Sequence, residues 1–276
     1  LYLNERKECI LRRDIDMPAW FYNLHVVTAL FLIYAVFGTI GFIAYKLNKK
    51  YFKLENHSPI ITVAQQTSIT FGTLFIAFWI ALNWQTLDNL SLDSKSEAQA
   101  ILDLYSSTHA INQEPQANNV RNAIENYLNS IVTEEYKSLE QGELNQHTGE
   151  LFNQLKIAVY HLPAKTLEEK ITYYHITTSL NTLVDFRFKR LDYVNGQMNG
   201  VLLIFFVVLL AIICFWSACI NNHNRKLSVL VLCSQYLIIL SSSWLILEID
   251  RPFQGYFKVD NSAFVQIQQQ VKQLHY

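Results

Sequence analysis

Hydrophobic positions along this chain gather in four long, uncharged runs rather than in short alternating segments. A helix needs about 20 apolar residues to cross the hydrocarbon core of a membrane, and each of the four runs is of about that length. They cover residues 22–45, 60–84, 198–220 and 227–247. The loops inside each pair are short, so each pair predicts an antiparallel hairpin. The pattern therefore predicts an all-α integral membrane protein with four transmembrane helices in two hairpins.

The stretch between the hairpins predicts a helical extramembrane domain. Apolar residues recur there at helical spacing, which predicts helices over 90–111, 116–139, 147–161 and 165–194, and no strand pattern occurs. The apolar stripe of the last helix comprises Leu167, Ile171, Tyr174, Leu180, Leu183 and Val184.

The chain thus divides into five segments. These are an N-terminal polar segment (1–20), a first hairpin (21–84), the helical domain (85–196), a second hairpin (197–249) and a C-terminal tail (250–276). The first apolar run is too long for a signal-peptide core, and we interpret it as a retained span. The tail is rich in glutamine and is expected to form a short helix.

Charge separates the domain from the rest of the chain. Residues 85–196 hold 15 acidic and 9 basic side chains, a net charge of −6, although the whole chain has a net charge of −1. With four spans, the domain and both termini share one side of the membrane. Nine Lys and Arg residues, Arg187 and Arg190 among them, lie near span ends on that side, and six lie in the two short loops. These tallies nearly cancel, and our hypothesis is a cytoplasmic domain and termini at a bacterial inner membrane.

The second span carries the candidate functional residues. Gln66, Thr70 and Thr73 share one helix face, and Phe71, Phe75 and Phe78 share the neighbouring face. One interpretation is a pore-lining helix, whose polar face coordinates ions or water and whose phenylalanines form a constriction. The alternative is ordinary helix packing, in which hydroxyl and small residues let backbones approach. From these residues alone, packing is the more common explanation.

The sequence contains no complete catalytic or metal-binding motif. Its eight histidines form no HExxH pair and its four cysteines form no Cys-x-x-Cys pair, so neither an enzyme activity, a metal nor a cofactor is predicted. The adjacent pairs Glu134-Glu135 and Glu168-Glu169 lie on helices and point apart. We interpret both pairs as solvated surface.

Several motifs together resemble the bestrophin-like domain family of bacterial membrane proteins. They are Asn56-His57, Glu97-Ala98, Leu102, Leu104 and Tyr105, Tyr127, Glu134-Glu135-Tyr136, and an element after the fourth span formed by Asp250, Arg251, Pro252, Phe253 and Gly255. The last element is the most specific, and the resemblance covers about residues 20–265.

The resemblance implies a function and a site. The family is named for its likeness to bestrophins, which are pentameric anion channels whose second span lines the pore. Carried over, this puts Phe71, Phe75 and Phe78 near the constriction. The dense acidic cluster that binds calcium in animal bestrophins is missing, so calcium gating is not expected. The negative domain weakly opposes anion selectivity, and cation conduction, as in some bacterial bestrophins, fits at least as well.

Two functions from different classes follow as hypotheses. The first is an oligomeric ion channel with span two lining the pore. Its expected partners are the lipid bilayer, inorganic ions and further copies of the chain, as a pentamer if the assembly is bestrophin-like, with no nucleic acid. The second is a membrane-anchored sensor or scaffold whose helical domain binds a ligand or a partner protein.

Overall fold

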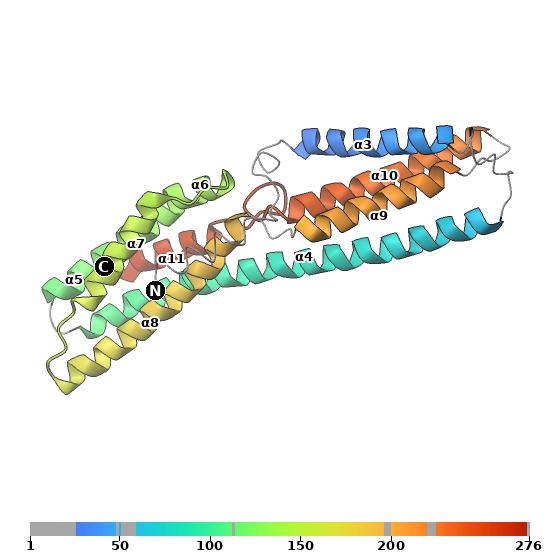
Figure 1. Ribbon diagram of the computed structural model, residues 1–276. Coiled ribbons are helices and arrows are strands. Elements are labelled where there is room, and N and C mark those ends of the chain that lie inside the picture. The colour runs from blue at the N-terminus through green and yellow to red at the C-terminus, as the bar shows by residue number, and fades with distance from the viewer. Residues whose placement is uncertain are drawn as a thin grey trace. The chain divides into compact units, whose positions relative to one another are not determined.

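A computed structural model describes residues 26–47, 50, 59–111, 114–195, 200–219 and 225–274 of the 276-residue chain (Figure 1). Within these ranges every regular element is helical, which confirms the predicted all-helical class. The predicted segment 1–20 and the Asn56-His57 motif lie outside the described residues.

The chain forms two compact units. Unit 1 comprises residues 1–84 and 197–250, and unit 2 comprises residues 85–196 and 251–276. Helix α4 (Pro59–Ser107) belongs to both units because it runs through the boundary at residue 84 without a break. The span predicted over 60–84 and the domain helix predicted over 90–111 are therefore one helix.

Unit 1 is a set of long apolar helices packed side by side. Besides the first part of α4, it contains α3 (Val26–Leu47), α9 (Gly200–Cys219) and α10 (Arg225–Ile249). Helix α3 packs against α9 and α10. The core is built from Phe37 of α3, Ile76 and Trp79 of α4, Leu210 and Ile213 of α9, and Ile239 and Ile246 of α10.

Helices α4 and α9 approach closely at a glycine. Gly72 is buried, and a Cβ atom added there would overlap the Cδ1 atom of Ile213. About two turns away on each helix, the rings of Trp79 and Phe206 meet edge to face with centroids 5.0 Å apart. A small residue beside large aromatic groups lets the two backbones come together, which is how apolar helices pack in membranes.

One helix in the described ranges, α4, is both long and apolar enough to cross a membrane. Shorter apolar stretches lie in the other three helices of unit 1, at Tyr34–Ile43, Ile204–Ser217 and Cys233–Ile249. The count of four spans in two hairpins therefore stays a prediction.

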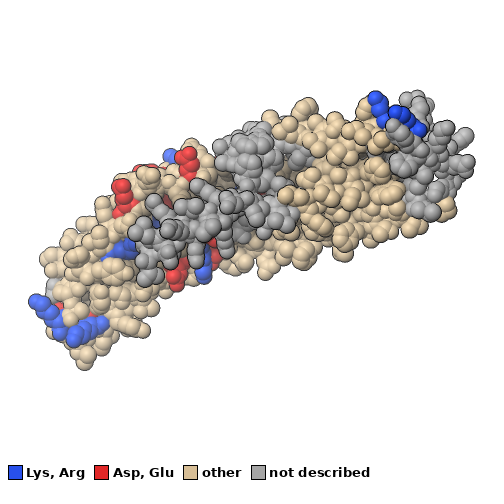
Figure 2. Space-filling model, viewed as in Figure 1, with Lys and Arg blue, Asp and Glu red and all other residues tan. Residues whose placement is uncertain are grey.

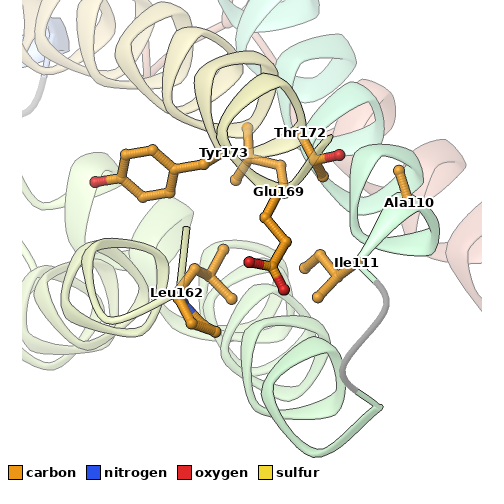
Figure 3. Close-up of a pocket in the computed structure, with 8 residues that line it drawn as sticks. Ala110, Ile111, Leu162, Glu169, Thr172 and Tyr173 are labelled. Atoms are coloured by element: carbon orange, nitrogen blue, oxygen red, sulfur yellow. The ribbon is translucent and has the colours of Figure 1, made fainter. Parts of the chain in front are cut away.

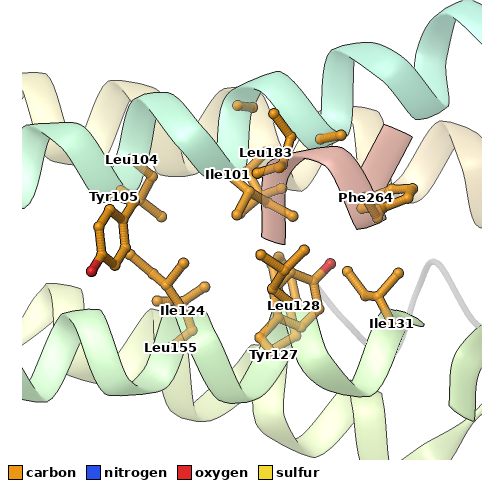
Figure 4. Close-up of a cluster of buried hydrophobic side chains, with 14 of the residues drawn as sticks. Ile101, Leu104, Tyr105, Ile124, Tyr127, Leu128, Ile131, Leu155, Leu183 and Phe264 are labelled. Carbon is orange, nitrogen blue, oxygen red and sulfur yellow. The ribbon is translucent and has the colours of Figure 1, made fainter. Parts of the chain in front are cut away.

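Unit 2 is a helical domain with one apolar core. After α4 come η3 (Thr108–Ala110), α5 (Glu114–Ser130), η4 (Ile131–Glu135), α6 (Tyr136–Glu140), α7 (Gln146–Tyr160), α8 (Leu167–Asp192) and η5 (Tyr193–Asn195), and α11 (Ser262–Leu274) completes the unit. Figure 4 shows side chains from α4, α5, α7, α8 and α11 meeting in this core, including Ile101, Ile124, Leu155, Leu183 and Phe264.

The helix predicted over 116–139 is interrupted by a π turn. Helices α5 and α6 flank the five-residue π segment η4, in which Ile131 and Glu135 are buried. A π turn adds one residue to the helical repeat and is often found at functional sites. Tyr136 and Leu139, which follow, are buried as well.

Helix α8 turns a different face to the core from the one the stripe predicted. Its buried residues are Ile176, Leu180, Leu183, Arg187 and Arg190, whereas Leu167, Ile171 and Tyr174 are exposed. The predicted stripe was wrong because it joined residues from two faces: Leu167 and Leu183 are 16 residues apart, which on a helix of 3.6 residues per turn puts them about 160° apart. Thr166 and Glu169 start α8 with a capping box, in which each side chain accepts a hydrogen bond from the other residue's backbone N–H.

The tail forms the expected short helix, α11, and packs into unit 2. Phe264, Ile267 and Val271 are buried on one side of it. Just before it, the Asn261 side chain donates to the backbone oxygen of Val132 inside the π segment at 3.1 Å. The tail thus supplies a partner for a carbonyl at the irregular turn.

The end of α6 offers a test of the backbone. Gly142 has φ 75°, and nothing lies within 4 Å of the Cβ position that another residue would add. Gly142→Ala should therefore lower the free energy of unfolding by about 1 kcal/mol through backbone strain alone. Gly149→Ala, at an equally open position inside α7, should raise it by about 0.5–1 kcal/mol. Helical circular dichroism during chemical denaturation measures both, and equal effects of the two variants would contradict this account.

Candidate functional site

The residues proposed to line a pore lie on the outward side of α4 in unit 1. Gln66, Thr70 and Thr73 are exposed, and so are Phe71 and Phe78, with 53% and 62% of their surfaces accessible. The opposite side of this segment, with Gln65, Gly72, Ile76 and Trp79, is buried. A polar strip and an aromatic strip therefore run side by side along the accessible half of the helix.

Two of the candidate residues have partners within unit 1. The Thr73 hydroxyl lies 3.0 Å from the backbone oxygens of Ile69 and Thr70, within its own helix. Phe75 is half-buried, and its ring meets the ring of Phe205 on α9 with centroids 4.8 Å apart. Phe75 therefore packs between helices, whereas Phe71 and Phe78 are the more accessible rings of the aromatic strip.

The core of unit 2 contains a second group of polar residues, the buried charge cluster of Glu97, Glu135, Arg187 and Arg190. Arg190 donates from Nε to Glu97 at 2.5 Å and from Nη2 to Glu135 at 2.6 Å. Arg187 donates to Glu135 at 2.7 Å. The Tyr127 hydroxyl accepts from Arg187 at 2.8 Å and donates to Glu97 at 3.0 Å. The cluster joins α4, the π segment and α8 through side chains that water does not reach.

Aromatic rings enclose the two arginines. Arg187 lies over the rings of Tyr127 and Phe152, and Arg190 lies over those of Tyr136 and Phe264. Ring faces carry partial negative charge and attract a guanidinium that has lost its water. Phe264 belongs to α11, so the tail closes one side of the cluster.

The acidic and basic side chains of the buried charge cluster hold one another in their charged forms. Burial alone would raise the pKa of Glu135, but the charges of Arg190 and Arg187 outweigh burial and lower it. Burial would likewise lower the pKa of Arg190, and the charges of Glu135 and Glu97 raise it well above the usual value. Burial raises the pKa of Tyr127 well above its usual value, which keeps its hydroxyl protonated as a donor. Charges of opposite sign therefore cancel inside the domain.

The sequence interpretation of Glu135 was wrong, and the burial of two arginines was not predicted. Glu134 is exposed as predicted, but Glu135 has only 1% of its surface accessible, because the π turn directs it inward. Arg187 and Arg190 were counted as charges near a span end, and both are buried within unit 2. A usable signal was present, because Leu180, Leu183, Arg187 and Arg190 are spaced as one helix face. Two arginines continuing an apolar face indicate buried partners.

The element after α10 makes a tight turn. The backbone N–H of Asp250 still donates to Ile246, and Pro252 then prevents the helix from continuing. Gly255 has φ 78°, which only glycine adopts without strain. Asp250, Arg251, Pro252 and Phe253 are buried, and the Phe253 ring meets that of Tyr136 with centroids 6.1 Å apart. The motif that identified the family is thus a structural turn whose phenylalanine enters the core of unit 2.

A pocket in unit 2 bears on the sensor hypothesis (Figure 3). Its lining comprises Ala110, Ile111, Leu162, Pro163, Glu169, Thr172, Tyr173 and Ile176. Glu169 is the polar group most suited to a ligand, but its carboxylate already accepts from the backbone N–H groups of Lys165 and Thr166 at 2.8 and 2.9 Å. We therefore interpret the pocket as the space around the N-terminal cap of α8. Among the described residues, no group of three or more His, Cys, Asp or Glu side chains could hold a metal ion.

Solved structures with the same helical architecture are bacterial Bestrophin homologues. A point variant of the homologue from Klebsiella pneumoniae has a TM-score of 0.63 at 11% identity, covering 89% of this chain and 98% of that chain. The structure of that homologue phased with zinc has a TM-score of 0.61 at 12% identity, covering 88% and 97%. At these identities the likeness establishes the fold. No curated protein matches the sequence.

The sequence itself establishes the family. A model of the Bestrophin-like domain matches residues 53–264. The chain therefore belongs to the Bestrophin-like domain family, which confirms the resemblance inferred from its motifs.

Removing one member of the buried charge cluster should destabilise the domain strongly. Arg190→Met leaves Glu97 and Glu135 buried without their shared partner and should lower the free energy of unfolding by about 3–5 kcal/mol. Tyr127→Phe removes one hydroxyl from the charged network and should cost about 2 kcal/mol. Lys258→Met breaks the half-exposed pair with Glu140 and should cost less than about 1 kcal/mol. Denaturant unfolding followed by circular dichroism measures the stability of the three variants. Equal losses of unfolding free energy in all three would refute the buried pairing.

Acid should weaken the same cluster. Because the charges of Arg190 and Arg187 hold the folded-state pKa of Glu135 below its ordinary value of about 4.5, the stability that Glu135 contributes is fully present above about pH 4.5. It is lost as the pH falls through the lower folded-state pKa. Glu135→Gln should therefore be the less stable chain at neutral pH, and the difference should shrink below about pH 4.5. Unfolding midpoints of both chains across pH test this, and a difference that does not change with pH would disprove it.

Proposed function

We propose that this protein is an oligomeric ion channel with four membrane spans in two hairpins, in which the unit 1 part of α4 lines the pore. The observation that carries the proposal is the accessible half of α4. Its polar strip contains Gln66, Thr70 and Thr73, and its aromatic strip contains Phe71 and Phe78. Membership of the Bestrophin-like domain family supports it.

The surface of unit 1 favours a membrane location and assembly. Large apolar side chains are exposed on every helix of the unit, for example Phe31, Leu74, Ile204 and Leu237. In Figure 2 this part of the molecule is tan, apart from blue side chains at one end, whereas red and blue groups are spread over unit 2. Soluble proteins rarely expose contiguous apolar surface of this kind. Lipid and neighbouring copies of the chain are the partners that would cover it.

A polar strip on a helix that lipid surrounds needs another partner. Amides and hydroxyls in hydrocarbon must meet protein or water, and in unit 1 the strip of Gln66, Thr70 and Thr73 lies on the accessible half of α4. Copies of α4 arranged around an axis would turn these strips towards a shared water-filled path. The number of chains around the axis is part of the proposal, and it is five if the assembly is bestrophin-like.

We assign the domain and both termini to the cytoplasmic side, as the bestrophin resemblance implies. Counting basic residues does not decide the matter, because Arg187 and Arg190 are buried in unit 2 and cannot meet lipid headgroups. The sensor hypothesis receives no support from the pocket beside Glu169, whose carboxylate is engaged in capping α8.

The constriction can be tested by removing its most accessible ring. Phe78→Ala should raise ion flux through reconstituted liposomes severalfold, because it widens an apolar narrowing without removing a packing contact of Phe75. Leu237→Ala is the matched control, since Leu237 is a large side chain on α10 with 68% of its surface exposed. It should leave flux unchanged.

The assembly is measured on the same preparation. The native mass in detergent should be a whole multiple, greater than one, of the 32.1 kDa chain mass. A monomer, or liposomes without ion flux, would refute the channel. Equal effects of the two alanine variants would refute α4 as the lining helix.

A further inference from the structure

The charged residues of unit 1 are divided between two places. Among the residues of this unit that the structure describes, the basic ones are Lys46, Lys50, Arg225 and Lys226, and the acidic ones are Glu248 and Asp250. The two acidic residues are buried at the end of α10, whereas Lys46 and Lys50 are exposed. Basic and acidic groups are therefore kept apart by the uncharged length of the helices.

The basic residues belong to one end of unit 1, where α3 and α9 finish and α4 and α10 begin. Gly72 of α4 lies against Ile213 of α9. Seven residues later on α4, Trp79 meets Phe206, which is seven residues earlier on α9. Helices α4 and α9 are thus antiparallel, and the end of α9 lies beside the start of α4. We call this the loop end of unit 1, and Figure 2 shows blue side chains gathered at one end of the apolar part.

The sequence of the two links adds to the positive charge of the loop end. Residues 48–58 contain three lysines and one glutamate, and residues 220–224 contain no charged residue. Together with Lys46, Arg225 and Lys226, this gives six basic residues and one acidic residue, a net charge of +5. Clusters of roughly four to eight Lys and Arg residues next to a membrane helix attract anionic lipid headgroups.

Lys46 lies against the apolar surface of α3. Its Nζ atom is 4.7 Å from the centroid of the Phe42 ring, which belongs to the preceding turn of the helix. Phe42 has 58% of its surface exposed, and Ile43 and Leu47 are exposed as well. Because the ring face attracts the ammonium group, the positive charge is held beside apolar side chains that acyl chains can cover.

This combination favours one class of partner. A phosphate group attracts ammonium groups, and acyl chains cover exposed apolar side chains. Free inorganic phosphate offers only the first interaction, and a zwitterionic phospholipid has a positive group in its own headgroup that opposes the lysines. An anionic phospholipid offers both interactions without that repulsion.

We infer that the loop end of unit 1 binds an anionic phospholipid, with Lys46 and Lys50 contacting the phosphate of its headgroup. The acyl chains of this lipid lie against Phe42, Ile43 and Leu47. The inference rests on the membrane location within the proposed function. It depends neither on ion conduction nor on the number of chains in the assembly.

The experiment measures which lipids the full-length chain retains. The chain in detergent is incubated with equal amounts of phosphatidylglycerol and phosphatidylcholine that have the same acyl chains, and native mass spectrometry counts the lipids that stay bound. Phosphatidylglycerol should be retained in excess. Lys46→Gln combined with Lys50→Gln should lower its retention at least about fivefold, which is the effect of a single lysine near anionic lipid.

Two further variants separate charge at this site from charge in general. Lys46→Arg combined with Lys50→Arg should keep the retention of phosphatidylglycerol, because a guanidinium also binds phosphate. Lys137→Gln combined with Lys170→Gln is the matched control, since it removes the same charge from exposed positions in unit 2. This control should leave retention unchanged.

The outcomes distinguish this inference from the function on which it rests. Equal retention of the two lipids by the unaltered chain would overturn it, and this comparison decides even if a variant does not fold. Equal losses in both glutamine pairs, or displacement of phosphatidylglycerol by millimolar inorganic phosphate, would also overturn it. In each of these cases the proposed channel stands. Liposomes without ion flux would instead refute the channel and leave the lipid site in place.

Discussion

Unit 2 is organised by one requirement, that a guanidinium removed from water must meet opposite charge. Arg190 is fully buried and meets Glu97 from α4 and Glu135 from the π segment. Each carboxylate comes from a different part of the chain, so the pairs form only when α4, α5 and α8 are in register. Apolar side chains such as Ile124 and Leu183 would tolerate small shifts, whereas a charge without its partner would not. The cluster therefore restricts how α4, the π segment and α8 can pack in unit 2.

Hydrophobic periodicity predicted the elements well because it reports directly on burial. The boundaries of α7, α9 and α10 lie within about two residues of the expected ones, as is usual for helix ends. The buried face of α8 was missed because apolar residues from two sides of the helix were grouped as one stripe, although their spacing places them on different faces. The core side of α8 includes Arg187 and Arg190, which a search for apolar residues leaves out.

Glu135 shows what periodicity cannot supply. Periodicity treats Glu134 and Glu135 as neighbours on the outer surface of a regular α-helix. The π turn instead places Glu135 inside the domain, where it pairs with the arginines of α8, and this tertiary contact is not encoded in the local pattern. The family motifs nevertheless pointed to this place, since Glu97, Tyr127 and Glu135 all belong to the cluster. The family motifs thus contain residues of the core of unit 2. The accessible strip of α4, in contrast, was located from helical spacing alone.

The position of α11 in the chain has a consequence for synthesis. Most of unit 2 is made before α9 and α10, yet its core is completed by Phe264 and Ile267, which come after both helices. Phe264 covers Arg190, and the ribosome has already passed the second apolar pair when that ring appears. Domains usually fold as units in the order of their synthesis. Here the domain must wait for its last helix, so unit 2 reaches its final packing only after all the apolar helices of unit 1 have been made.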